Sequence, residues 1–99
     1  MVNEKIQAAD RNLVHVYNRF PVALDHGEGV YLYDIDGKKY LDFAAGIAVC
    51  GLGYNNRELN EALKDQIDKL CHTSNLYYHE KCGQAAEALN RVSGMDRVF

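Results

Sequence analysis

Apolar residues recur at steps of three and four along three stretches of the chain. This period predicts amphipathic helices over residues 4–17, from Asn55 to about Cys71, and over residues 80–92. The middle stretch has the most regular apolar stripe of the three. The interval between the first two stretches lacks this period, and it is there that strands are expected.

Residues suited to capping stand at the ends of the three helical stretches. Asn3 can cap the first helix, and Asn55 with Glu58 has the spacing of a capping box for the second. Gly94 has the position of a left-handed C-cap after the third. Residues 97–99, which end on the apolar Val98 and Phe99, then read as the start of a strand, so we expect the chain to be the front of a longer protein. The alternative is a small domain that ends on an edge strand.

Between the first two helices the period changes to two, which is typical of strands. Residues 30–33 alternate aliphatic and aromatic side chains, residues 34–37 have turn composition, and residues 39–43 return. Residues 21–24 are a further extended segment, and residues 25–29 are expected to turn into the hairpin. The sequence therefore predicts three short antiparallel strands.

The run Ala44 to Gly53 contains no charged residue and three glycines. A surface loop would be polar, so we expect this run to be buried. Glycines and small side chains would allow its backbone to approach a ligand or another segment closely.

Composition excludes several classes of function. The chain has 99 residues, of which 47% are hydrophobic and 25% charged, as in globular proteins. A net charge of −3 provides no basic surface for nucleic acid. No apolar run approaches the roughly 20 residues that span a bilayer, and the N-terminus does not resemble a signal peptide, so we expect a cytoplasmic protein without a membrane partner. The cysteines are odd in number, and their spacing fits neither a disulfide framework nor a zinc site; we expect reduced thiols at Cys50, Cys71 and Cys82.

Motif-like strings lack the context that their chemistry requires. Residues 27–29 are a Gly-x-Gly string, but they precede a strand and open no helix, which excludes a dinucleotide fingerprint. Residues 34–37 lack the further oxygen ligands and the closing Glu of a calcium loop, so a simple turn is predicted. The four histidines lack metal-ligand spacing and are expected at the surface or an interface. No nucleophile setting is recognisable, and we assign no catalytic, cofactor-binding or metal-binding residue.

Four strings carry a resemblance over nearly the whole chain: YNRFPV at 17–22, GEGVYLYDIDGKKYLDF at 27–43, GIAV at 46–49 and HTSNLYY at 72–78. Together they resemble the opening of the ornithine-type, class-III branch of the pyridoxal-phosphate aminotransferases. GIAV and SNLYY narrow the resemblance to members that act on acetylornithine. One departure stands out, because members often have His-x-His-Pro after the glycine at Gly53, where this chain has Tyr54-Asn55-Asn56-Arg57.

The resemblance implies an α/β fold, α+β within these residues: the N-terminal segment of the PLP-dependent transferase fold, with a helix, a three-stranded antiparallel sheet and helices that lead into the large domain. Residues 1–54 would belong to the small domain and residues 55–99 would open the large one. The complete homodimer would move the δ-amino group of N-acetylornithine to 2-oxoglutarate, in arginine biosynthesis, with pyridoxal 5'-phosphate as electron sink. In the family the Ser-Gly-Thr phosphate loop and the Schiff-base lysine follow the position of Phe99, so these 99 residues alone should be inactive. Ornithine, succinylornithine and 4-aminobutyrate aminotransferases remain alternatives, as does a non-catalytic interaction module.

The resemblance also implies pocket and interface residues. Tyr17 aligns with an aromatic position that reaches substrate, and Ile47 with a position where the ornithine enzyme has tyrosine. Since Ile47 offers no hydroxyl to a free α-amino group, it suits a substrate whose α-nitrogen is acylated. Ser74 and Asn75 resemble a loop at the dimer interface near the active site. The alternatives are a helix-end Tyr17 stacked on Phe20, a core Ile47, and an N-cap pair at Ser74 and Asn75.

Overall fold

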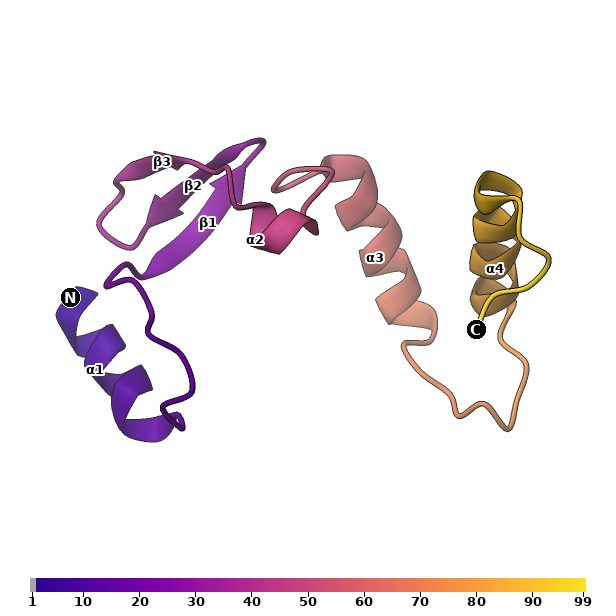
Figure 1. Ribbon diagram of the computed structural model, residues 1–99, viewed down its shortest axis with the longest axis horizontal. Helices are drawn as coiled ribbons and strands as arrows, with labels where there is room; N and C mark the ends of the chain where they lie inside the picture. Colours follow the sequence, from indigo (N-terminus) through magenta and orange to yellow (C-terminus); the bar gives the residue numbers. More distant parts are fainter. Residues whose placement is uncertain (1) are drawn as a thin grey trace. The chain divides into compact units, whose positions relative to one another are not determined.

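The structure is a computed structural model that describes residues 2–99, with side chains from Glu4 onward. Its contacts divide the chain into two compact units, one ending at Ala62 and the other beginning at Leu63, and each is described by itself. Four helices and three strands follow one another within the described residues (Figure 1): α1 Val2–Asn12, β1 Leu24–Glu28, β2 Tyr31–Asp34, β3 Lys39–Leu41, α2 Ala45–Ala48, α3 Arg57–Lys69 and α4 Glu80–Ser93.

Helix α1 ends at Asn12, earlier than the apolar period predicts. The Asn12 side-chain amide donates a hydrogen bond to the Ala8 carbonyl at 2.7 Å, and side chains that bond to nearby backbone in this way compete with helix continuation. Residues 13–16 then include two valines, whose branched side chains lower helix propensity. Because α1 begins at Val2, Asn3 lies within the helix and is not its N-cap; the Asn3 side chain lies outside the described part.

The three strands form one antiparallel sheet, as predicted, and their order is β1-β2-β3. The first strand lies later than the extended segment predicted over residues 21–24. In the hairpin, Tyr31 pairs with Leu41 and Tyr33 with Lys39. The prediction of a turn over residues 25–29 is wrong, because β1 covers Leu24–Glu28. Gly27 suggested a turn, but it serves close packing within the strand, since a Cβ at this position would collide with the ring of Tyr54.

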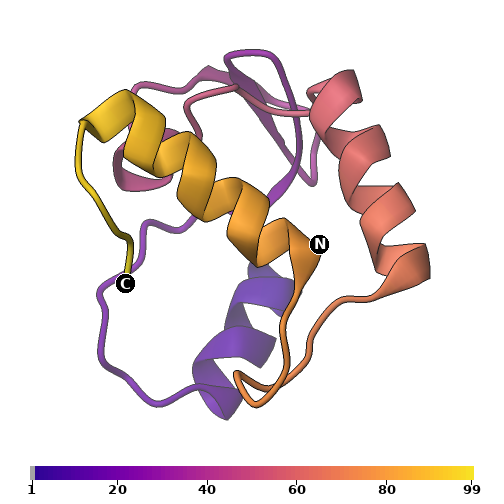
Figure 2. The same cartoon turned by 90° about the vertical axis from the view of Figure 1, so that its right-hand side faces the viewer.

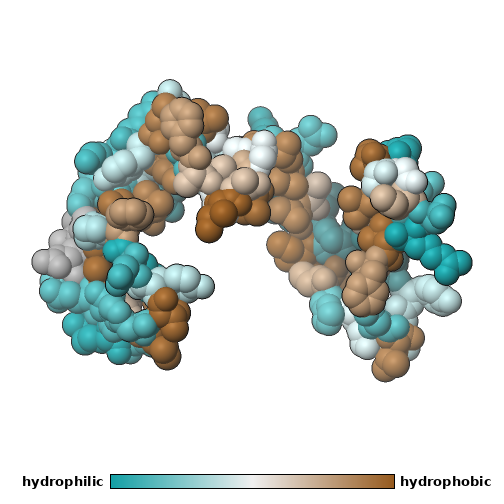
Figure 3. Space-filling model, viewed as in Figure 1, coloured by the Kyte–Doolittle hydropathy of each residue, from teal (hydrophilic) through white to brown (hydrophobic). Residues whose placement is uncertain are grey.

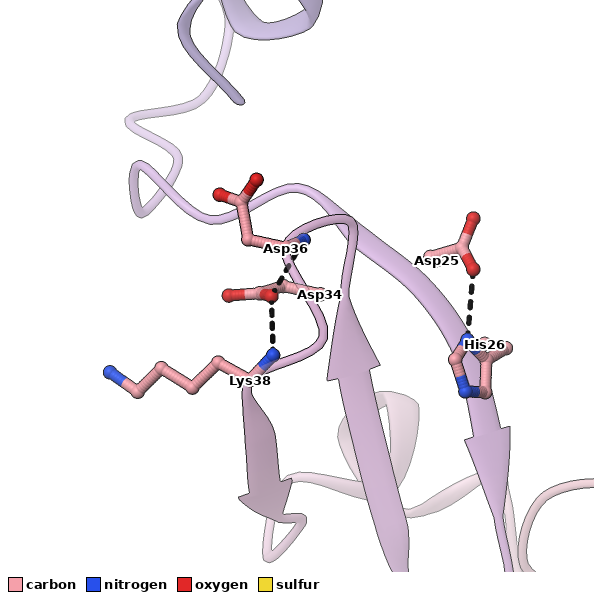
Figure 4. Close-up of polar contacts among 5 residues, drawn as sticks. All are labelled: Asp25, His26, Asp34, Asp36 and Lys38. Atoms are coloured by element: carbon pink, nitrogen blue, oxygen red, sulfur yellow. Dashed lines mark hydrogen bonds and ion pairs between the residues drawn. The ribbon is translucent and has the colours of Figure 1, made fainter. Parts of the chain in front are cut away.

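The turn between β2 and β3 is organised by Asp34, which is 8% exposed and is the one buried polar side chain among the described residues. Its Oδ1 accepts hydrogen bonds from the backbone N–H groups of Asp36 at 3.0 Å and Lys38 at 2.8 Å (Figure 4). Its Oδ2 accepts a bond from the Tyr40 hydroxyl at 2.8 Å. Both carboxylate oxygens accept hydrogen bonds from within the hairpin, so the predicted simple turn is confirmed.

His26 lies on β1 and is exposed, and its ring stacks on the Tyr33 ring with the two ring centroids 4.7 Å apart.

The Asp34 carboxylate should respond to removal of the Tyr40 hydroxyl. That hydrogen bond is the largest cause that lowers the pKa of Asp34 below 3.8, ahead of the opposing effect of desolvation and the backbone bonds. The contribution of Asp34 to stability is therefore complete above the ordinary pKa and is lost as pH falls through the lower folded-state pKa. We expect Tyr40→Phe to move the Asp34 pKa upward in an NMR titration of its carboxyl carbon. Tyr31→Phe, on the same hairpin, leaves the Asp34 contacts intact; an equal shift in both variants would contradict this assignment.

Helix α3 begins at Arg57, and its N-cap is Asn56 instead of the predicted Asn55. Asn56 Oδ1 accepts a hydrogen bond from the Leu59 N–H at 3.0 Å. Asn55 has a left-handed φ of 54°. Its side-chain amide nitrogen donates to the Glu28 carboxylate at 2.8 Å, and its Oδ1 accepts a bond from the Asn60 side-chain amide at 3.0 Å. The side-chain oxygen that a capping box would use therefore has another partner.

Helix α4 covers Glu80–Ser93, and Gly94 ends it with a φ of 71° and an N–H that bonds to the Asn90 carbonyl, as predicted. The predicted strand over residues 97–99 does not form within the described chain, and the segment after α4 is an irregular tail (Figure 2). A strand requires a pairing edge, and no described residue pairs with these.

Candidate functional site

The segment after β3 is organised by the carboxylate of Asp42. The Asp42 N–H donates to the Val30 carbonyl at 3.0 Å, which joins this residue to the hairpin. Its Oδ1 accepts bonds from the backbone N–H groups of Ala44 at 2.9 Å and Ala45 at 3.1 Å. Its Oδ2 accepts a bond from the Tyr54 hydroxyl at 2.5 Å. The Tyr54 hydroxyl is the largest cause of the lowered pKa of Asp42, followed by the Ala45 N–H.

The short element α2 (Ala45–Ala48) is a left-handed turn. All four of its residues have positive φ, between 47° and 65°. The Ala48 N–H donates to the Ala44 carbonyl at 3.0 Å, and the Val49 N–H donates to the Ala45 carbonyl at 2.8 Å. A left-handed conformation costs non-glycine residues roughly 1–2 kcal/mol each. Such backbone strain persists where the surroundings impose it and is concentrated at functional sites.

Ile47 lies in this left-handed turn with 90% of its surface exposed. Val49, next to the turn, is 78% exposed. No residue of the run Ala44 to Gly53 is buried by the described residues, and Ile47 lies in no core that they form. No hydrophobic side chain among residues 4–99 is buried, and hydrophobic residues lie at the visible surface of strands and helices (Figure 3). The apolar side chains of the run Ala44 to Gly53 thus form an exposed surface on and beside the left-handed turn.

Tyr17 lies in the irregular segment between α1 and β1 and is 69% exposed. It does not end a helix, because α1 stops at Asn12. The guanidinium carbon of Arg19 lies over the Tyr17 ring, 5.6 Å from the ring centroid. Tyr17 lines a hollow together with residues of α1 and of its own segment, and Ile47 is not among the residues that line it.

Ser74 and Asn75 lie between α3 and α4, and both are exposed. The Ser74 hydroxyl accepts a bond from the Leu76 N–H at 3.2 Å, which forms a local turn. The N-cap of α4 is His79, whose Nδ1 accepts a bond from the Lys81 N–H at 3.2 Å. The alternative of an N-cap pair at Ser74 and Asn75 is therefore wrong, and their side chains do not serve the start of α4.

The residues described here do not fit the pyridoxal-phosphate group that the resemblance implies. All six lysines of the chain are exposed, whereas a Schiff-base lysine is activated by desolvation or a cationic neighbour. Lys38 and Lys39 lie over the rings of Tyr40 and Tyr31, at 5.0 and 3.7 Å. No cluster of metal-ligating side chains occurs among residues 2–99. The three cysteines are free, as predicted.

Sequence reasoning missed the pairing of Asp42 with Tyr54. The two residues are twelve positions apart, and their contact crosses the whole apolar run. The sequence held one hint, since Tyr54 opens the string at which the chain departs from the pattern that the resemblance implies.

The helices of residues 2–99 are too short or too polar to cross a bilayer.

Comparison with known proteins identifies relatives over nearly the whole chain. The family model for class-III aminotransferases matches residues 13–99. An acetylornithine aminotransferase of Archaeoglobus fulgidus is 45% identical over 94 residues, which cover 95% of this chain and 25% of that protein. The chain thus spans about a quarter of the length of the curated relatives that it matches.

Solved structures agree with the relatives found by sequence. The crystal structure of acetylornithine aminotransferase from Elizabethkingia anophelis matches with a TM-score of 0.91 and 33% identity, over 97% of this chain and 25% of that one. The ornithine delta-aminotransferase of Plasmodium falciparum matches with a TM-score of 0.91 and 25% identity, again over 97% and 25% of the two chains. The hairpin, the helices and the family model point to one assignment: the chain belongs to the class-III aminotransferase family.

Proposed function

We propose that this chain is the N-terminal quarter of a cytoplasmic, homodimeric aminotransferase that moves the δ-amino group of N-acetylornithine to 2-oxoglutarate in arginine biosynthesis. The acetylornithine aminotransferase of Archaeoglobus fulgidus is 45% identical to this chain over 95% of its length. The observation that carries the choice of substrate is Ile47, an apolar side chain presented by a left-handed turn. A hydroxyl at this position would suit a free α-amino group, and an apolar group suits an acylated one.

Within that enzyme the described residues supply walls and contacts. Residues 1–54 belong to the small domain in this proposal, and residues 55–99 open the large one. Tyr17 and Ile47 line the substrate pocket, while Ser74 and Asn75 contact the partner subunit near the active site. The exposure of all four side chains supports this, because a pocket wall or an interface residue must be accessible in the isolated segment. Pyridoxal phosphate supplies the chemistry and is bound by residues outside the present 99.

A substrate comparison with the complete gene product tests the proposal. We expect transamination with 2-oxoglutarate, with kcat/KM for N-acetylornithine at least tenfold above that for ornithine, because a single pocket contact changes selectivity by roughly 10- to 200-fold. A ratio in favour of ornithine would assign the chain to the ornithine enzymes. A gene product of 99 residues that is folded, monomeric and inactive would favour the non-catalytic module.

A chimera provides the control for the origin of the activity. In it, the matched residues of this chain replace the corresponding quarter of the Archaeoglobus fulgidus acetylornithine aminotransferase, which aligns over 94 residues. We expect the chimera to retain its substrate preference. Loss of preference with retained folding would show that this segment has a different pocket wall.

A further inference from the structure

We propose that Tyr54 and Asp42 form a positioning pair that sets the orientation of the α2 turn and hence the place of Ile47 in the substrate pocket. The inference rests on the proposed function. Four steps connect Tyr54 to Ile47.

The first step fixes the Tyr54 backbone to the sheet. The Tyr54 N–H donates to the Gly29 carbonyl at 2.7 Å, and the Gly29 N–H donates to the Tyr54 carbonyl at 2.9 Å. This reciprocal pair joins the end of the apolar run to the loop between β1 and β2. Gly53 makes the approach possible, because a Cβ there would stand 2.6 Å from the Gly29 carbonyl oxygen.

The second step fixes the Tyr54 ring. The ring lies directly against Gly27 of β1, where a side chain on the strand would collide with it. Glycine on one side and backbone bonds on the other restrict the orientation of the ring. The hydroxyl is therefore carried to a defined point beside Asp42.

The third step is the hydroxyl–carboxylate bond. At 2.5 Å it has the length of a charge-assisted hydrogen bond. The pKa of Tyr54 is raised, chiefly by the Asp42 carboxylate, and the pKa of Asp42 is lowered, chiefly by the Tyr54 hydroxyl. Both shifts favour a protonated donor and an ionised acceptor. Cys50 is the other titratable group against Tyr54, and its thiol acts in the same direction on the tyrosine.

The fourth step connects the carboxylate to the strained turn. Asp42 accepts bonds from the Ala44 and Ala45 N–H groups at the point where φ becomes positive. The carboxylate is thus shared between a fixed tyrosine and the start of the turn. Two residues after Ala45 the chain presents Ile47. Removal of the hydroxyl leaves Asp42 Oδ2 with only its longer bond from the Ala45 N–H, at 3.2 Å. The carboxylate is then free to rotate, and a constraint that favours the left-handed conformation is lost.

The test is Tyr54→Phe in the complete holoenzyme. Tyr31→Phe is the matched control, because the donors to the Asp42 carboxylate are Tyr54, Ala44 and Ala45 and do not include Tyr31. For Tyr54→Phe we expect kcat/KM for N-acetylornithine to fall about tenfold relative to that for ornithine, mainly through KM, as expected for loss of one charge-assisted hydrogen bond. The control should leave the ratio unchanged. Tyr54→His, which restores a donor, should recover part of the selectivity.

A double-mutant cycle separates positioning from a general structural role. If Tyr54 acts through Ile47, Ile47→Ala should remove most of the effect of Tyr54→Phe, so the two changes are not additive. Additive effects, or an equal loss for both substrates, would overturn the positioning role.

Hydrogen exchange provides a readout that does not depend on activity. In Tyr54→Phe the Ala45 amide should exchange about tenfold faster than in the parent, while amides of α4 remain unchanged. Asp42→Asn should have the same effect if Tyr54→Phe is unexpectedly unstable. Unchanged exchange at Ala45 would refute the pair even if the enzyme proves to use another substrate. Absence of N-acetylornithine turnover in the parent would instead refute only the proposed function.

Discussion

Ile47→Tyr should lower kcat/KM for N-acetylornithine by about 5- to 150-fold in the complete enzyme and raise it for ornithine. The range is the rate equivalent of the 1–3 kcal/mol cost of a buried polar group left without its partner. With N-acetylornithine bound, the added hydroxyl would face an acylated α-nitrogen, which is neutral and has no ammonium N–H to donate. The same hydroxyl would accept from the free α-ammonium group of ornithine. Because α2 is a constrained turn, the new side chain should occupy the same place as Ile47.

Ile47→Phe is the matched control, since it adds the ring without the hydroxyl. We expect it to weaken N-acetylornithine turnover through size alone and to give no gain for ornithine. The measurement is steady-state kinetics with both amino donors at saturating 2-oxoglutarate. Equal behaviour of the tyrosine and phenylalanine variants would mean that Ile47 limits pocket volume and does not select the charge state of the substrate's α-nitrogen.

Gly53→Ala should strongly destabilise the part of the chain that contains the sheet, by about 2–4 kcal/mol. Gly53 has a φ of 73°, which costs a non-glycine residue roughly 1–2 kcal/mol. The new Cβ would also lie 2.6 Å from the Gly29 carbonyl oxygen. That overlap forces open the reciprocal bonds between Gly29 and Tyr54, each worth about 0.5–1.5 kcal/mol.

Gly51→Ala is the control, because nothing lies within 4 Å of its added Cβ. Denaturant unfolding and hydrogen exchange of the Gly29 amide should both separate the two variants. The Gly53→Ala variant should also lose substrate selectivity, since the Tyr54 ring would no longer be fixed. An unfolding free energy for Gly53→Ala within 0.5 kcal/mol of that for Gly51→Ala, roughly the scatter among neutral surface substitutions, would contradict this account.

The hairpin could be predicted because its information is local. Alternating side chains and the turn over residues 34–37 lie within a few positions of one another, and the structure returns them as β2 and β3. The helices α3 and α4 were predicted to within two residues at each end for the same reason. The end of α1 was not, because a side-chain bond of Asn12 interrupts a period that continues in the sequence.

The candidate site depended on longer connections. The residues Tyr17, Ile47, Ser74 and Asn75 came from the resemblance, and no spacing pattern would have selected them. The Asp42–Tyr54 bond escaped because no sequence pattern links two residues twelve positions apart. It requires the Tyr54 backbone to be bonded to Gly29, and that requires glycines at positions 27 and 53.

Sequence alone determined the antiparallel hairpin and the main helices, since short-range periodicity and turn chemistry encode them. It also indicated the family, through strings that resemble those of known members. Only the tertiary structure decided that the uncharged run is an exposed left-handed turn. Local propensity disfavours positive φ at Ala45, Ile47 and Ala48. The conformation results from bonds to Asp42, and Asp42 is oriented by a tyrosine that a different part of the chain fixes on the sheet. Backbone strain that is supported by contacts distant in the sequence leaves no periodic pattern. The left-handed turn could therefore not be predicted from the sequence.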